Sequence, residues 1–277
     1  MAQEPVRELS TGGARVMIAE MDGSMIPTVE IETDEKGRKI KGDKRKHRQL
    51  EWREARLSVA RDPRSVTAHY RATMGDAEQA GWELVECVVE AGGGSSTRLH
   101  AVGDGAPWIV NQIQKRFGHK ASYLIDFYHV SEYLASASEL VGEKKKIGWL
   151  RKQQQRLKAN RINEVMRELT KLAAREKAGV TAVVGKPGAN REEPASACKR
   201  YLENRLEYLD YKTTLKAGLP ISSGEVESGH RWVIQARLKV AGAWWKIDNA
   251  EKMLKLRTVR ANDQWEPYWR RLRQAAS

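Results

Sequence analysis

The chain has 277 residues and a formal net charge of +13, with a sequence pI of about 9.7. So basic a charge balance indicates a polyanionic partner. No run approaches the roughly 20 apolar residues of a membrane span, and no signal-like apolar core follows Met1. We therefore expect a cytoplasmic protein with no membrane partner. Two cysteines, far apart and without Cys-x-x-Cys spacing, argue against a disulfide framework or a zinc site.

The first third of the chain is strand-like. Residues 14–23, ARVMIAEMDG, form a mostly apolar run that ends in Asp22-Gly23, the pattern of a buried strand whose polar end emerges at an edge. Residues 51–62 and 65–74 alternate between apolar and polar side chains. This alternation predicts two further strands, paired as antiparallel neighbours.

Two strand–helix units follow a first helix. Residues 76–92 have helical spacing, and we expect their buried face to carry Trp82, Val85, Val88 and Val89. Residues 97–118 predict a strand, an Asp104-Gly105 turn and a helix. Residues 120–138 repeat this order around Asp126. Three strands followed by two strand–helix units predict an α/β layered architecture.

The middle of the chain differs in charge and pattern. Residues 144–177 contain twelve Lys and Arg against three Glu, a net charge of +9, and predict two long basic helices. Residues 180–196 contain prolines and glycines that predict an exposed loop, and residues 197–218 are helical again. We expect an α/β domain formed by residues 1–136 and 219–277, interrupted by a helical insertion at 137–218.

Three carboxylates stand out in this framework. Asp22 and Asp104 each follow an apolar strand and precede a glycine, which permits a tight turn and close approach of a ligand. Late in the chain, residues 221–228, ISSGEVES, predict a turn and a helix start that carries Glu225 and Glu227. Carboxylates without a balancing lysine repel one another, and Mg²⁺ relieves this because it prefers oxygen ligands. Two such ions about 3.5–4 Å apart can drive phosphodiester displacement.

Several motifs occur in an order that resembles a known enzyme family. These are MDGSMIP, GDGAPWI, IDFYHVSEYL, GLPISSGEVESGHRWVIQARLKVAGAWW and MLKLRTVRANDQWEPYW. Together, from about Arg15 to Trp269, they resemble the DDE transposases of bacterial insertion sequences, of the ISKra type and, more distantly, the Mutator-like type. The resemblance implies a ribonuclease H-like mixed sheet flanked by helices, interrupted by an all-helical insertion before the last catalytic residue.

The resemblance also implies roles for individual residues. The catalytic and metal-binding carboxylates would be Asp22, Asp104 and, from the family pattern Ser-Gly-x-x-Glu, Glu227. Glu225 would then serve the start of its helix, where the helix dipole favours acidic groups. The family's Asp-or-Cys-x-x-His signature matches Asp126 and His129, which we expect to position DNA or support the metal site. The implied cofactor is a pair of Mg²⁺ ions, for which Mn²⁺ could substitute.

Candidate DNA contacts lie in two segments. The basic run 36–48 has a net charge of +7 and would form either a solvated hairpin loop or a grip on phosphates. The segment after Gly224 adds arginines, a lysine and a Trp-Trp pair that could stack on unpaired bases or belong to the core. The residues assigned to DNA are Lys44, Arg45, Lys46, Arg231, Arg237, Lys239, Trp244 and Trp245.

The leading hypothesis is a DNA transposase that cleaves at transposon ends and transfers strands to target DNA. Its partners would be double-stranded DNA and further copies of the chain, in a homodimer or larger synaptic assembly. The protein would be associated with the nucleoid. Alternatives are a DNA-binding remnant inactive in transposition and a structure-selective nuclease of the same fold. Only 21 residues precede Asp22, without a helix-turn-helix pattern. We therefore expect the chain alone to distinguish its cognate ends poorly.

Overall fold

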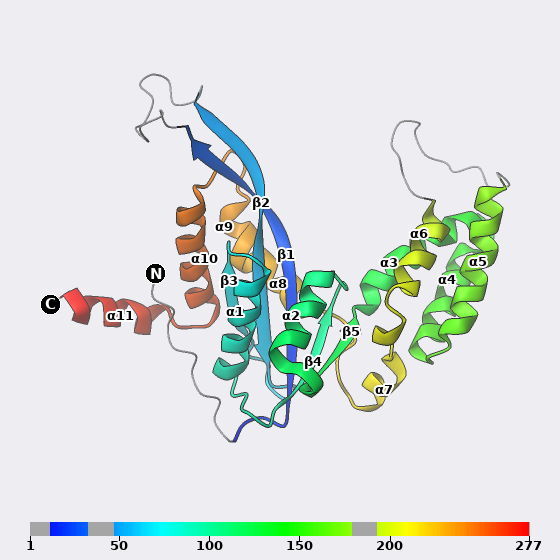
Figure 1. Ribbon diagram of the computed structural model, residues 1–277, viewed down its shortest axis with the longest axis horizontal. Coiled ribbons are helices and arrows are strands. Elements are labelled where there is room, and N and C mark those ends of the chain that lie inside the picture. The colour runs from blue at the N-terminus through cyan, green and yellow to red at the C-terminus, as the bar shows by residue number, and fades with distance from the viewer. Residues whose placement is uncertain (1–11, 33–46, 179–192, 277) are drawn as a thin grey trace. The chain divides into compact units, whose positions relative to one another are not determined.

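The computed structural model describes residues 12–32, 47–178 and 193–276 (Figure 1). Five strands within these residues form one sheet. In chain order they are β1 (Val16–Ile31), β2 (Arg48–Arg61), β3 (His69–Thr73), β4 (Arg98–Gly103) and β5 (Ala121–Ile125).

Helices alternate with the later strands and fill the second half of the chain. The α-helices before residue 179 are α1 (Ala77–Glu90), α2 (Pro107–Phe117), α3 (Phe127–Ser138), α4 (Glu143–Lys158) and α5 (Ile162–Lys177). Those after residue 192 are α6 (Pro194–Glu203), α7 (Tyr211–Lys216), α8 (Gly224–Gly229), α9 (Ala236–Leu238), α10 (Ile247–Ala261) and α11 (Trp265–Ala276). Short 3₁₀ turns are η1 (Gly118–Lys120), η2 (Glu139–Val141) and η3 (Leu206–Tyr208), and η4 (His230–Gln235) is a π-helical segment between α8 and α9.

The sheet is mixed and has the strand order β3-β2-β1-β4-β5. β1 and β2 pair antiparallel from Ile18 opposite Arg61 to Ile31 opposite Arg48, and β2 and β3 are also antiparallel. The three antiparallel neighbours are therefore confirmed. So is the predicted fold class, because a mixed sheet in this order, flanked by helices, is consistent with a ribonuclease H-like fold.

The first strand is longer than its sequence pattern predicted. The expected end at Asp22-Gly23 is wrong: β1 continues to Ile31, with Asp22 opposite Leu57 and Gly23 opposite Arg56. The antiparallel ladder with β2 overrides the local turn preference of Asp-Gly, because β2 offers hydrogen-bond partners well past this point. Asp22 consequently lies in the middle of a strand, while Asp104 directly follows the end of β4.

Helices cover both faces of the antiparallel part of the sheet. On one face, Ser58 of β2 donates its hydroxyl hydrogen to the Ala80 carbonyl of α1 at 3.1 Å. The other face packs apolar residues of β1 and β2, such as Leu57, against α8, η4 and α10. The buried side of α1 is only partly the predicted one, because Val88 is buried whereas Trp82 is exposed. Arg116 of α2 holds the Trp82 ring near the surface, 3.9 Å from its centroid.

The described residues fall into two compact units. Described residues within Met1–Ala101, Pro107–Ser122 and Gly224–Ser277 form the first, and those within Val102–Ala106 and Tyr123–Ser223 form the second. The predicted insertion, 137–218, lies within the second unit. Helices α3 to α7 of that unit share one apolar core, to which α5 contributes Val165, Leu169 and Leu172 at helical spacing.

The two long basic helices predicted over 144–177 are present as α4 and α5. Most of the predicted loop at 180–196 lies outside the described residues, and α6 already begins at Pro194. The basic run 36–48 also lies mostly outside them, and only His47 and Arg48 of it are described. Within the described part of the chain, no helix combines the length and the apolar character that crossing a membrane requires.

Candidate active site

Two acidic residues of β1 lie on the face that the C-terminal helices cover. Glu20 and Asp22 share this face because side chains two positions apart on a strand point the same way. Glu20 is buried, and its Oε2 accepts a hydrogen bond from the Val226 N–H at 2.7 Å. This bond satisfies one of the free N–H groups in the first turn of α8, where the helix dipole favours a carboxylate. It fixes the start of α8 against β1 across 206 residues of sequence.

Asp22 makes the second contact between β1 and this helical segment. Its Oδ2 lies 2.9 Å from Nε2 of His230, the first residue of η4. The two atoms are close but are not aligned as a hydrogen bond, and among the described residues neither ring nitrogen of His230 has a hydrogen-bond partner. The Asp22 side chain keeps 38% exposure while that of His230 keeps 6%. His230 thus contacts Asp22 on the side that faces the protein, and the rest of the Asp22 carboxylate is open to solvent.

The two glutamates of α8 have different surroundings. Glu225 accepts a hydrogen bond at 2.6 Å from Nε of Arg61, at the end of β2. Glu227 is exposed, and its carboxylate has no ion-pair or hydrogen-bond partner among the described residues. Glu227 also precedes His230 by three residues, which places the two on neighbouring sides of the same helical segment. Of the pair, Glu225 is tied down in an ion pair and Glu227 is free to bind a ligand.

Asp104 belongs to the second unit and forms a tight turn there. Its Oδ1 accepts a hydrogen bond from the Ala106 N–H at 2.8 Å, the pattern of an Asx turn. Gly105 has φ +79, and a Cβ at this position would lie 2.5 Å from Cδ1 of Ile125 and 2.6 Å from Nε of Arg205. Glycine is therefore required both for the backbone conformation and for the space.

Two tyrosines and an arginine hold the backbone of this turn. The Tyr201 hydroxyl donates to the Asp104 carbonyl at 2.6 Å, and the Tyr123 hydroxyl accepts from the Gly105 N–H at 3.0 Å. Arg205 donates from Nε to the Gly105 carbonyl at 3.2 Å. Burial raises the pKa of both tyrosines well above its ordinary value, so both hydroxyls stay protonated. The turn that carries Asp104 is consequently fixed on both sides.

Asp126 is a structural residue in this arrangement. It is the N-cap of α3, and its Oδ1 accepts hydrogen bonds from the N–H groups of Tyr128 at 2.6 Å and His129 at 3.1 Å. Its Oδ2 accepts from both the N–H and the hydroxyl of Ser223, each at 2.6 Å. With both oxygens engaged, Asp126 anchors the residues that immediately precede α8.

The His129 side chain lies among aromatic rings of the second unit. Its ring makes edge contacts with Tyr133 and Tyr201, and those two tyrosines stack on each other. Nδ1 of His129 is 3.9 Å from Oε2 of Glu132, a loose and exposed approach. Because Tyr201 bonds the Asp104 carbonyl, His129 supports the Asp104 turn through Tyr201.

The carboxylates suit a hard cation in chemistry, although they do not form a ready-made cage. Among residues 12–32, 47–178 and 193–276, no group of three His, Cys, Asp or Glu side chains is close enough to hold a metal ion. Mg²⁺ needs no such cage, since it is usually bound by one or two carboxylates together with substrate phosphates. Asp22 and Glu227 offer accessible carboxylate oxygens of the preferred type.

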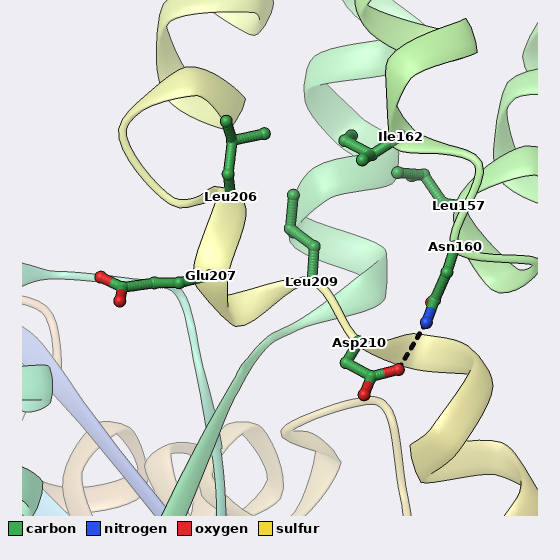
Figure 2. A pocket seen from close by; sticks show the side chains of 7 residues that line it. All are labelled: Leu157, Asn160, Ile162, Leu206, Glu207, Leu209 and Asp210. Atoms are coloured by element: carbon green, nitrogen blue, oxygen red, sulfur yellow. Dashed lines mark hydrogen bonds between the residues drawn. The ribbon is translucent and has the colours of Figure 1, made fainter.

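A shallow hollow in the second unit is separate from all of the predicted site residues. Its volume is about 160 Å³, below the range of about 300–1,000 Å³ usual for ligand pockets. Figure 2 shows its polar edge, where the Asn160 amide donates to the Asp210 carboxylate at 2.5 Å. That bond lowers the pKa of Asp210, which also caps α7. The polar groups are explained by local structure, and the hollow is no candidate active site.

The residues assigned to DNA are only partly described. Lys44, Arg45 and Lys46 lie outside the described residues. Of the assigned basic residues that the structure describes, Arg231, Arg237 and Lys239 are all exposed.

The Trp-Trp pair divides between surface and core. The Trp245 backbone bonds to β1 through the Val29 N–H and the Pro27 carbonyl, and its ring packs against the core under the Arg237 guanidinium. Trp244 meets the exposed Trp52 of β2 edge to face, with 6.3 Å between ring centroids. Both tryptophans are half-buried: Trp244 contacts a surface ring, whereas Trp245 mainly anchors the chain to β1.

Sequence reasoning missed three residues that build the site. Glu20 and His230 hold α8 and Asp22, and Tyr201 holds the Asp104 turn. A signal existed for two of them: Glu20 is an acidic residue inside an apolar run, and His230 follows Glu227 at helical spacing. Tyr201 gave no signal, because its contact depends on the fold of the second unit.

Comparisons with family models, with curated proteins and with solved structures found no match to this chain.

Proposed function

We propose that the chain is a DDE transposase, an enzyme that cuts DNA phosphodiester bonds at transposon ends and joins the freed strands to target DNA. One observation carries the proposal most: the helical segment with Glu227 is fixed on β1 beside Asp22 by the Glu20–Val226 and Asp22–His230 contacts. The strand order supports it, because β4, which ends just before Asp104, is the sheet neighbour of β1.

In this proposal Asp22, Asp104 and Glu227 together hold two Mg²⁺ or Mn²⁺ ions. When bound, such ions stabilise charge on the attacking and leaving oxygens of an in-line displacement. His230 keeps Asp22 Oδ2 directed toward one side, as the outer partners of metal ligands commonly do. The Arg61–Glu225 ion pair keeps Glu225 out of the reaction.

The charge of the chain supports DNA as the substrate. The net charge of +13 and the exposed Arg231, Arg237 and Lys239 suit contacts to phosphates, which position DNA without reading its sequence. Each phosphate neutralised releases counterions, so binding should weaken steeply with salt. Joining two transposon ends also requires two or more copies of the chain in a homodimer or larger assembly.

One observation favours a second candidate, a DNA-binding remnant of such an enzyme. Among the described residues, no three potential ligands stand close enough to hold a metal. A remnant would keep the fold and the basic surface but would not cleave DNA.

The two candidates are separated by a cleavage assay with the matched amides Asp22→Asn and Asp104→Asn. We expect the wild-type chain to nick supercoiled DNA with Mg²⁺ and to stop when the metal is chelated. Each variant should lose cleavage by about a thousandfold or more, since a carboxylate that binds metal is replaced by a neutral isostere. Melting temperature and DNA affinity serve as controls and should stay near the wild-type values. Wild-type DNA binding without any metal-dependent cleavage would support the remnant instead.

A further inference from the structure

The last helix, α11, carries an aromatic stripe that its own unit leaves largely exposed. The stripe consists of Trp265, Tyr268, Trp269 and Leu272, spaced so that they share one helical face. Trp265 and Trp269 are each 37% exposed and Leu272 is 44% exposed. The aromatic rings contact one another edge to face: Trp269 meets Trp265 with centroids 5.5 Å apart and Tyr268 at 5.3 Å.

The way α11 leaves the body of the first unit makes this stripe accessible. A sharp turn at Asp263, with φ 55, separates α10 from α11. Figure 1 shows α11, in red, leading away from the end of α10. An exposed apolar face of this kind on a terminal helix is typical of a protein–protein contact.

We propose that α11 is a self-association surface, on which the α11 helices of two copies of this chain pair antiparallel about a twofold axis. The stripe matches itself in that arrangement. Trp265 of one copy lies opposite Leu272 of the other, and Tyr268 lies opposite Trp269, so that each aromatic ring meets an apolar side chain. A twofold interface requires this self-complementarity, because each copy presents the same patch.

The charges beside the stripe match in the same register. Glu266 and Arg273 lie on one flank of α11, and a twofold axis places a flank opposite the same flank of the other copy. Glu266 of one copy therefore faces Arg273 of the other, and the pair occurs twice. Arg271 occupies the opposite flank and faces the neutral Gln264. Arg270 points away from the interface.

A second copy suits the stripe better than DNA does. DNA offers phosphates, which arginines bind, whereas four neighbouring apolar side chains require an apolar partner. Two 12-residue helices bury less than the roughly 1,200 Å² of a standard interface, so the dimer should be weak, with a Kd in the micromolar range. The interface needs no DNA and no metal, so its failure would leave the proposed cleavage by single copies untouched, and the assembly that joins two ends would then need another contact.

Sedimentation equilibrium of the full chain without DNA tests the pairing. We expect a reversible dimer that persists when salt is raised, because salt screens the repulsion between two copies that each carry +13. Trp269→Ala should weaken dimerisation by more than about tenfold, as expected for a central aromatic anchor. A wild-type chain that stays monomeric at about 100 µM would overturn the proposal.

The charge pairs provide the more specific arm of the test. Glu266→Arg and Arg273→Glu should each weaken the dimer by about tenfold, because each change turns two attractive pairs into repulsive ones. The double variant exchanges the charges and should restore the wild-type Kd to within about threefold. The matched control, Arg270→Glu, should have no comparable effect. Single variants that dimerise normally, or a double variant that is not restored, would contradict the antiparallel register.

Discussion

At the scale of single residues, the site is defined by what holds each carboxylate in place. Asp126 has both oxygens occupied by backbone and hydroxyl donors, and Glu225 is bound by Arg61. Glu227 has no such partner among the described residues. Asp22 Oδ1 accepts a hydrogen bond from the Gly23 N–H at 2.7 Å and its Oδ2 lies 2.9 Å from His230 Nε2, yet its side chain keeps 38% exposure. This contrast separates carboxylates that stabilise the fold from those that are free to act on a ligand.

The role of His230 can be measured directly with two variants. In the proposed enzyme it holds Asp22, so His230→Ala should raise the Mg²⁺ concentration needed for half-maximal cleavage by about 10–100-fold. His230→Gln, which keeps a polar N–H group beside Asp22, should recover part of that loss. The measurement is a Mg²⁺ titration of DNA nicking. If both variants lose stability but keep the wild-type Mg²⁺ response, His230 is only a packing residue.

At the scale of elements, α1 and α2 are joined through one carboxylate. Glu78 of α1 accepts hydrogen bonds from Lys115 at 2.7 Å, from Gln112 at 3.2 Å and from Arg116 at 2.6 Å, all on α2. The hydrogen bond from Lys115, followed by those from Gln112 and Arg116, lowers the pKa of Glu78 from about 4.5 to about 2. Because the folded pKa lies below the unfolded one, the stabilisation is fully present above about pH 4.5 and is lost as the pH falls toward 2.

The contacts of Glu78 with α2 predict that Glu78→Gln lowers the melting temperature by an amount that depends on pH. At pH 7 the variant should melt about 1–3 °C below wild type, since the exposed carboxylate is well screened by solvent. The difference in melting temperature between variant and wild type should narrow at pH 3, because much of the stabilisation from the Glu78 carboxylate is lost at that pH. Glu143→Gln on α4, an exposed carboxylate paired with Lys146, is the control and should show little change at either pH. If the difference in melting temperature is the same at pH 7 and pH 3, the ionised Glu78 carboxylate is not its cause.

Most elements were predictable from local pattern, while their bounds and faces were not. Alternation in β2 and the strand–turn–helix order around Asp104 lead directly to the observed elements. The length of β1 was not predictable, because pairing with β2 decides whether Asp22-Gly23 turns or continues. Trp82 was placed in the core by spacing alone, but Arg116 from a different helix holds it at the surface.

The candidate site was predictable at the level of residue types. Asp22, Asp104 and Glu227 were selected from the order of motifs, with no knowledge of their neighbours. The partners Glu20, His230 and Tyr201 depend on contacts between residues far apart in the chain, and local sequence contains little of that information. The family pattern already favoured Glu227 over Glu225, and the fold adds a physical difference between them, because Arg61 binds Glu225.

At the scale of the whole molecule, the proposed catalytic residues come from both compact units. Asp22 and Glu227 belong to the first unit, and Asp104 belongs to the second, where tyrosines and Arg205 fix its turn. The two neighbouring glutamates of α8 provide an internal comparison, because they lie on the same short helix and differ in their partners.

The central claim is tested most directly by measuring Mg²⁺-dependent nicking of DNA by Glu227→Gln and Glu225→Gln side by side. We expect Glu227→Gln to lose cleavage by about a thousandfold or more while its melting temperature and DNA affinity are retained. Glu225→Gln should retain cleavage to within about tenfold and instead lose stability, because it breaks the ion pair with Arg61. Normal cleavage by Glu227→Gln together with loss of cleavage in Glu225→Gln would contradict the account.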